Sequence, residues 1–230
     1  KNKGLSFFDR NIRIKLLGWK MIKNFNNADI ISAESKESLC LIKEFTNKEM
    51  FLSINGSNDE IIFLENKKQI RKDNIAVIVG TQRYKALINS YHIFKTLKNK
   101  NKHLKLFLIG DRKDIPKKFY KDRSIFMTGI ISQGEVIKLL KKAKYYISTT
   151  RVENSFNAAA EGIVFADESY ISDIAQHREL LENEKFEKVL MPCLSNSILR
   201  VKGKEITGKN LKLWDQILLE IVHKVELLNM

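Results

Sequence analysis

Short apolar runs alternate with amphipathic stretches along most of this chain, and their order predicts a parallel α/β fold. Unbroken apolar runs are typical of strands that are covered on both faces, and apolar residues spaced three and four apart are typical of helices. The expected strands of the larger part lie at 75–79, 104–109, 124–128, 145–148, 169–172 and 188–191. Helices are expected between them. The right-handed crossover rule then predicts a doubly wound, Rossmann-like parallel sheet.

The same pattern divides the chain into three parts. Two further strands at 28–33 and 49–54, with a helix near 36–45, precede a polar connection around 66–74. We therefore expect a first part at 1–65, a Rossmann-like domain at 66–207 and an amphipathic C-terminal helix at 208–230. That helix has apolar residues at spacings of three and four, which predict a stripe packed into a core. The stripe consists of Leu211, Trp214, Leu218, Ile221, Val222, Val225 and Leu228.

Two glutamates eight positions apart are the feature that most indicates chemistry. Glu153 follows a predicted strand, and Glu161 lies in the helix that comes next, with Asn154 or Ser155 as its expected N-cap. A rise of 1.5 Å per residue would place the two carboxylates about 10–12 Å apart, the length of an extended ligand. The helix N-terminus between them favours an anion such as a diphosphate.

Two other loops at the carboxyl ends of predicted strands carry candidate ligand contacts. Gly80 begins a loop with Arg83 and Lys85, whose cations could clamp a diphosphate or could simply be solvated. Gly129 is followed by Ile130, an apolar residue suited to a planar base. In open parallel sheets, ligands bind beyond this edge of the sheet.

Charge and composition leave several partners open. The chain has 230 residues, 41 Lys and Arg against 27 Asp and Glu, and a formal net charge of +14. This charge favours an anionic partner, or it reflects a compositional habit spread over solvated faces. The two cysteines, Cys40 and Cys193, lack metal-ligand spacing. No apolar run reaches the length of a membrane span. A basic N-terminal segment around Trp19 predicts a helix that packs on the sheet, with a membrane surface as the alternative.

An ordered set of motifs resembles glycosyltransferase family 4 over about residues 28–225. The matching motifs are Ala28–Ser35, Asn55-Gly56, Ile78–Gly80 followed by Lys85, Leu106–Gly110, Phe126–Gly129, Glu153 with seven residues to Glu161, and Ser172–Leu180. The resemblance implies the C-terminal, donor-binding half of a GT-B fold, in which two Rossmann-like domains form the enzyme. It also implies a longer first domain than the 27 residues before Ala28 provide, so the acceptor half is expected to be missing.

The resemblance also implies a role for each matching residue. Glu153 would contact the donor sugar and matter for transfer, Glu161 would hold the ribose hydroxyls, and Lys85 would bind the diphosphate. The backbone N–H groups after the first glutamate would approach the sugar and diphosphate, at Asn154, Ser155 and Phe156. Two departures stand out. Thr81 replaces the arginine usual in the family, so either Arg83 substitutes for it or one phosphate contact is missing, and Asn154-Ser155-Phe156 replaces a glycine-rich turn.

The expected function is that of a retaining hexosyltransferase domain. It would take a UDP- or GDP-sugar and serve a saccharide or lipid-linked acceptor in bacterial surface polysaccharide or glycolipid synthesis. No cofactor or metal is expected, because the sequence has no Asp-x-Asp triplet and no His or Cys metal spacing. The expected location is the cytoplasm, with peripheral membrane contact as an open alternative. No specific nucleic-acid partner is expected. A catalytically inactive GT-B-like partner or scaffold domain is the alternative function.

Overall fold

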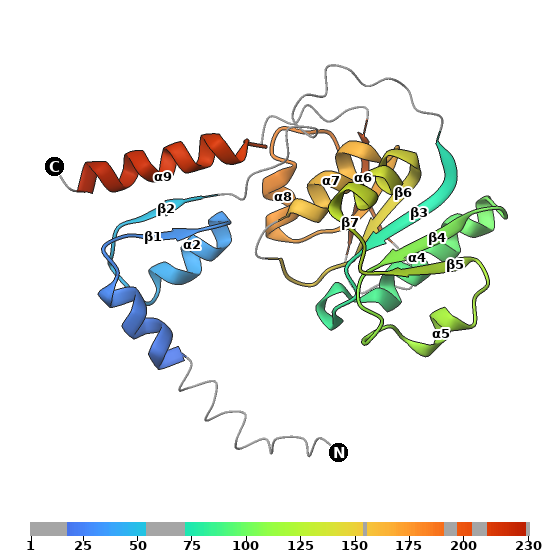
Figure 1. Ribbon diagram of the computed structural model, residues 1–230, viewed down its shortest axis with the longest axis horizontal. Helices are drawn as coiled ribbons and strands as arrows, with labels where there is room; N and C mark the ends of the chain where they lie inside the picture. Colours follow the sequence, from blue (N-terminus) through green and yellow to red (C-terminus); the bar gives the residue numbers. More distant parts are fainter. Residues whose placement is uncertain (1–17, 54–71, 154–155, 191–196, 204–210, 229–230) are drawn as a thin grey trace, which may run out of the picture. The chain divides into compact units, whose positions relative to one another are not determined.

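The chain forms two compact units in the computed structural model (Figure 1). The described residues are 18–53, 72–153, 156–190, 197–203 and 211–228. One unit comprises Lys1–Ile54 with Leu219–Met230, and the other comprises Asn55–Leu218. The boundaries expected near residues 65 and 207 lie outside the described residues and stay predictions. None of the helices in the described segments is long and apolar enough to cross a membrane.

The larger unit contains a seven-stranded sheet with the order β5-β4-β3-β6-β7-β9-β8. Its strands are β3 Asp73–Val79, β4 Lys105–Ile109, β5 Ile125–Gly129, β6 Ala143–Ser148, β7 Glu168–Ser172, β8 Glu187–Val189 and β9 Ile198–Lys202. The five strands from β5 to β7 are parallel, with Val77 beside both Phe107 and Tyr146. The chain winds outward from β3 in both directions. These five parallel strands confirm the predicted doubly wound α/β fold.

Helices connect the parallel strands as expected from the periodicity. They are η2 Arg83–Lys85, α4 Leu87–Lys100, α5 Lys117–Tyr120, α6 Gln133–Lys142 and α7 Asn157–Phe165; α8 Ala175–Leu180 follows β7, and α9 Trp214–Leu228 follows the last strand. One face of β3 and β4 places Ile78 and Leu106 against Phe94 of α4 and Phe119 of α5 in a single apolar cluster. α6 and α7 contact each other and the sheet. The right-handed crossovers place them on the face opposite α4. The sheet is therefore covered on both sides.

The distal edge of the sheet differs from the prediction. The strand expected at 188–191 is β8, which pairs antiparallel with β9, and β9 pairs antiparallel with β7. The connection between β8 and β9 has too few residues for a crossover helix, and short connections join antiparallel strands. The sequence analysis missed β9, because Arg200 interrupts its apolar pattern. Arg200 donates hydrogen bonds to Glu168 at 2.9 Å and to Glu187 at 3.0 Å, so its charge is satisfied within the sheet.

The smaller unit contains the short elements expected before residue 55. β1 Ile31–Ala33 and β2 Met50–Leu52 pair in parallel, and α2 Lys36–Lys43 connects them. Ser35 caps α2 by accepting a hydrogen bond from the Ser38 N–H at 3.2 Å. A helix over residues 18–27 precedes β1. Trp19 is exposed on it, so the packing expected for the basic segment does not extend to this side chain.

The core stripe predicted for α9 is wrong for most of its members. Trp214, Leu218, Val222 and Val225 are all exposed, and Ile217 is the buried apolar side chain among the described residues of this helix. The periodicity predicted the helix correctly, but most of the residues predicted to be buried are exposed. Apolar residues occupy more than one face of α9, and spacing alone does not decide which of them packs.

Candidate functional site

The carboxyl ends of β3 and β6 bring Lys85 and Glu153 together. These strands are neighbours in the sheet; Lys85 ends η2 after β3, and Glu153 follows β6. The Lys85 Nζ donates a hydrogen bond to Glu153 Oε1 at 2.5 Å, and the two side chains are only 11% and 12% exposed. An opposite charge at this distance, mostly removed from water, fixes both side chains. Two residues that are 68 positions apart thus form one centre.

The local backbone makes room for Lys85. Gly80 has φ +90°, which side chains disfavour, and a Cβ atom there would lie 3.0 Å from Lys85 Cε, so the lysine would have to shift slightly. The Gly80 N–H donates to the Ile109 carbonyl at 2.8 Å, and the Arg151 N–H donates to the Tyr84 carbonyl at 2.8 Å. These bonds tie the loop to β4 and to the segment that carries Glu153. Gly80 therefore has a steric role here.

Two other residues of this loop have partners other than Lys85 and Glu153. Thr81 is buried and donates its hydroxyl hydrogen to the Asp111 carbonyl at 2.5 Å. The Arg83 side chain is 92% exposed, with Nε 3.5 Å from Asp114 Oδ1. The structure does not bring Arg83 to the pair, and its role as a phosphate ligand stays a prediction.

Glu161 lies inside α7 and is held by a residue that the sequence analysis missed. It is 7% exposed, and Gln133 Nε2 of α6 donates to its Oε1 at 2.5 Å. Burial raises the pKa of Glu161, and the Gln133 hydrogen bond opposes part of that rise. Ser132 and Glu135 form a capping box at the start of α6. This box was a sequence signal that could have placed Gln133 at a helix N-terminus.

The start of α7 differs from the prediction. α7 begins at Asn157 with Phe156 as its N-cap, and Phe156 is buried and makes no side-chain capping bond. The expected N-cap at Asn154 or Ser155 is wrong, because the buried Phe156 ring anchors the helix start two residues later than Asn154. Asn154 and Ser155 lie outside the described residues. The roles of their backbone N–H groups stay predictions.

Ile130 lies on the surface beyond the carboxyl end of β5. It is 82% exposed and follows Gly129, which has φ +75°. An exposed apolar residue here can cover the face of a planar group, since burial of its side chain is favourable. The base contact of Ile130 stays a prediction.

His177 is the second residue whose surroundings the sequence did not indicate. The sequence analysis gave its segment no chemical role. It is fully buried, and its Nδ1 lies 2.7 Å from the carbonyl oxygen of Ser172, the last residue of β7. The pKa of His177 is lowered to about 4, mainly by burial; the Ser172 hydrogen bond opposes this shift, and the nearby Lys85 charge adds to it. His177 is therefore neutral near pH 7 and lies within the electrostatic reach of Lys85.

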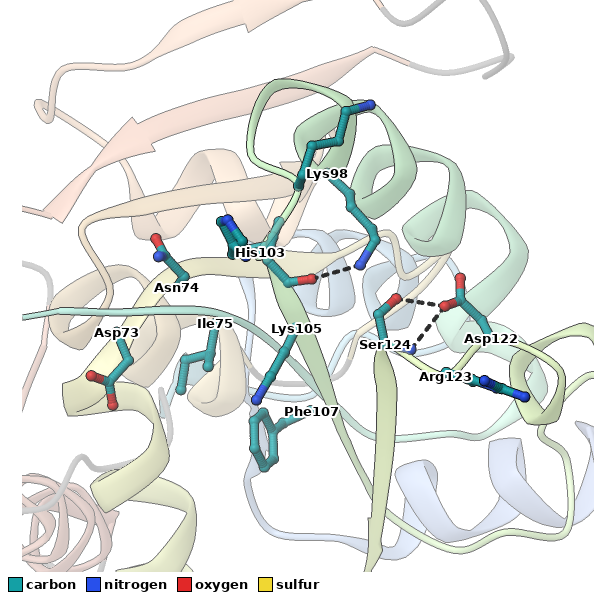
Figure 2. A pocket seen from close by; sticks show the side chains of 12 residues that line it. Asp73, Asn74, Ile75, Lys98, His103, Lys105, Phe107, Asp122, Arg123 and Ser124 are labelled. Carbon is teal, nitrogen blue, oxygen red and sulfur yellow. Dashed lines mark hydrogen bonds between the residues drawn. The ribbon is translucent and has the colours of Figure 1, made fainter.

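A separate cavity of about 790 Å³ lies at the amino ends of β3 and β4 and before β5 (Figure 2). Its lining is basic in part, but Lys98 Nζ donates to the Leu104 carbonyl at 3.0 Å, and Arg123 points away from Lys105. Asp122 accepts hydrogen bonds from Ser124. Because the cations do not converge, the cavity lacks the features of a specific anion site. Among the described residues, no group of three His, Cys, Asp or Glu could hold a metal ion.

Comparison with known proteins identifies the fold. Neither a protein-family model nor a curated protein matches the sequence. Among solved structures, the pneumococcal O-GlcNAc transferase GtfA in complex with UDP and GlcNAc is similar, with a TM-score of 0.60 and 14% identity over 76% of this chain and 36% of that one. A point mutant of Staphylococcus aureus TarM, in complex with fondaparinux, alpha-GlcNAc-glycerol and UDP, has a TM-score of 0.57 and 16% identity, over 73% and 35% of the chains.

A third similar structure is an enzyme with a different activity. It is a UDP-forming alpha,alpha-trehalose-phosphate synthase from Burkholderia xenovorans in complex with glucose-6-phosphate, with a TM-score of 0.55 and 13% identity over 71% of this chain and 50% of that one. This chain thus spans about a third to a half of the length of these structures. The three are GT-B glycosyltransferases, and this chain shares their α/β architecture with a parallel-dominated sheet.

Proposed function

We propose that this chain is the donor-binding part of a nucleotide-sugar glycosyltransferase, with Lys85 and Glu153 at its centre. The observation that carries the proposal is the 2.5 Å pair itself, mostly buried at the carboxyl ends of neighbouring parallel strands. Ligands of open α/β sheets bind at this edge. Two of the similar structures contain UDP, which supports a nucleotide ligand here.

Lys85 supplies the charge that the reaction needs. Transfer of a sugar from a nucleotide diphosphate leaves negative charge on the diphosphate, and a preorganised cation in a largely dry site stabilises it. Lys85 Nζ has three N–H donors and gives one to Glu153, which leaves donors for phosphate oxygens. Arg83, with its exposed side chain, can add a second cation by rotating toward the same diphosphate.

The two glutamates then have different roles. Glu153 contacts the donor sugar, and its pairing with Lys85 keeps its carboxylate at the site. Glu161 accepts hydrogen bonds from the ribose hydroxyls, with Gln133 fixing the orientation of its carboxyl group. Two neutral hydroxyl donors satisfy a buried carboxylate without adding charge. Neither glutamate acts as a general base in this proposal.

The finer features of the proposed reaction follow from the resemblance to family 4. The donor is a UDP- or GDP-hexose, the acceptor is a saccharide or lipid-linked saccharide of a surface polysaccharide or glycolipid, and the anomeric configuration is retained. Lys85, Arg83 and the N-terminus of α7 take the place of a metal ion at the diphosphate. Ile130 covers one face of the base. The membrane-linked acceptor would bring the protein to the cytoplasmic membrane surface.

Calorimetric titration with UDP tests the proposal. Lys85→Met should weaken UDP binding about 10- to 100-fold, because a hydrogen bond to a charged group is lost. Lys102→Met is the matched control, since Lys102 lines the cavity at the opposite edge of the sheet. The Lys102→Met variant should bind UDP with the same affinity as the wild type. Absence of binding by the wild type at millimolar UDP, or equal binding by Lys85→Met, would refute the proposal.

A catalytically inactive partner domain is the second candidate. Thr81 favours it, because the residue that replaces the family's arginine is buried and bound to Asp111 rather than available to a phosphate. An inactive domain would bind UDP yet show neither transfer nor slow hydrolysis of any sugar nucleotide. Product analysis over a panel of UDP- and GDP-sugars separates the two functions.

A further inference from the structure

His177 has an unused hydrogen-bonding atom at the edge of the candidate site. Among the buried side-chain atoms of the described residues, its Nε2 is the one without a hydrogen-bond partner. Buried polar atoms are nearly always paired, because leaving one unpaired in a dry environment is unfavourable. A partner for this atom is therefore expected when the site is in use.

The Ser172 carbonyl determines what kind of partner Nε2 can take. A carbonyl oxygen only accepts hydrogen bonds, so the Nδ1 atom 2.7 Å away must carry the ring hydrogen. Nε2 then has a free lone pair and is an acceptor. The missing partner must be an N–H or O–H donor.

The sheet order indicates the donor. β3, β6 and β7 are consecutive in the sheet, and their carboxyl ends lead to Lys85, Glu153 and His177 respectively. Lys85 is the charged residue that acts on the His177 ring. The cation adjacent in sequence, Arg178, is already paired with Asp173 at 2.5 Å, and Lys188 lies 3.2 Å from the same carboxylate. Lys85 Nζ gives one hydrogen to Glu153, which leaves two.

We propose that His177 positions the Lys85 ammonium. The Nε2 atom of His177 accepts a hydrogen bond from one N–H group of Lys85, while Glu153 accepts a hydrogen bond from a second. The third N–H then points to a diphosphate oxygen, a step that rests on the proposed function. Three acceptors around one ammonium fix its location in the donor site. His177 touches neither the donor nor the acceptor in this arrangement and is a positioning residue.

A neutral acceptor suits this location better than another carboxylate. Lys85 and Glu153 together carry no net charge, so a second carboxylate would make the centre negative and repel a diphosphate. Neutral His177 satisfies the ammonium without that cost. Its buried ring also adds no flexible side chain that must be ordered on binding.

A measurement without nucleotide tests the contact between His177 and Lys85. Histidine-labelled protein is titrated by NMR in the wild type, in Lys85→Met and in the control Lys102→Met. Removing the Lys85 charge should raise the pKa of His177 above about 4, whereas the control leaves it unchanged. An unchanged pKa in Lys85→Met would overturn the proposal.

Two substitutions at residue 177 then separate positioning from packing. His177→Asn keeps an N–H for the Ser172 carbonyl but lacks an acceptor at Nε2, whereas His177→Gln places an amide oxygen near the Nε2 location. UDP affinity should fall about 10-fold in His177→Asn and less than about threefold in His177→Gln. Equal loss in both, or none in His177→Asn, would overturn the proposal. If the wild type binds no UDP, the proposed function is refuted. The NMR titration without nucleotide then still shows whether Lys85 lies close to His177.

Discussion

At the scale of single residues, the site combines one cation with two carboxyl groups whose environments differ. Glu153 has Lys85 as its ionic partner, whereas the partner of Glu161 is the neutral amide of Gln133. Burial without a cation raises the pKa of Glu161. The two glutamates are thus the same residue type with different partners, which agrees with their separate proposed roles.

Glu161 should make the protein less stable as the pH rises. Its folded pKa is raised above the unfolded value, so the native state binds more protons and the free energy of unfolding falls as pH rises through the folded pKa. Glu161→Gln removes this ionisation. Urea unfolding should show the variant more stable than the wild type at pH 7, with the difference shrinking as the pH falls. A variant less stable at pH 7 would contradict this account.

His177 should act in the opposite direction. Its pKa of about 4 lies below the ordinary value of 6.5, so the unfolded state binds more protons between these values. Stability from His177 is then present above pH 6.5 and is lost as the pH falls toward 4. The contribution of His177 to the free energy of unfolding should fall by about 3 kcal/mol between pH 7 and pH 4. Urea unfolding of His177→Gln should therefore show a smaller loss of stability over this range than the wild type. An identical pH profile in that variant would contradict the prediction.

At the scale of elements, the approach of α7 to β6 sets the location of Glu161. Gly162 follows Glu161, and a Cβ atom on it would lie 2.2 Å from the Tyr146 ring of β6. Ala159 and Ala160 are also buried in this helix. Small residues let the helix lie close to the sheet, so the glutamate is held at the sheet edge.

Gly162→Ala should therefore destabilise the protein by about 1–3 kcal/mol, since the added methyl group displaces the Tyr146 ring. Gly134 in α6 is the matched control, because a Cβ atom there meets nothing within 4 Å. Gly134→Ala should be neutral or stabilise by up to about 1 kcal/mol, as alanine favours helices. Thermal unfolding of both variants checks the prediction. Equal effects would show that α7 does not pack tightly on β6.

The elements also show what sequence reasoning can and cannot reach. Strand and helix order followed from local periodicity, and the Lys85 and Glu153 loops followed from the rule for parallel sheets. The pairing of β9 and β8 beyond β7 could not be predicted from local periodicity. Arg200 interrupts the apolar pattern of β9, and its hydrogen-bond partners, Glu168 and Glu187, lie on other strands. The same limit applies to Gln133 and His177. Their importance comes from contacts with residues distant in sequence, and no local pattern reports such contacts.

At the scale of the whole molecule, charge alone does not locate the site. The chain carries a net charge of +14, yet the candidate centre is an electrically balanced pair, and the basic cavity lies at the opposite edge of the sheet. The chain spans about a third to a half of the structures that it resembles. Donor binding is therefore the part of the proposed activity that this chain can be tested for directly.

The most direct test of the central claim is an NMR titration of labelled protein with UDP. The account predicts that amide shifts change in the loop from Gly80 to Lys85, around Ile130 and Gln133, and next to Glu153 and Glu161. Residues of the opposite cavity, such as His103 and Arg123, should not respond. Changes confined to that cavity, or no changes at millimolar UDP, would contradict the account.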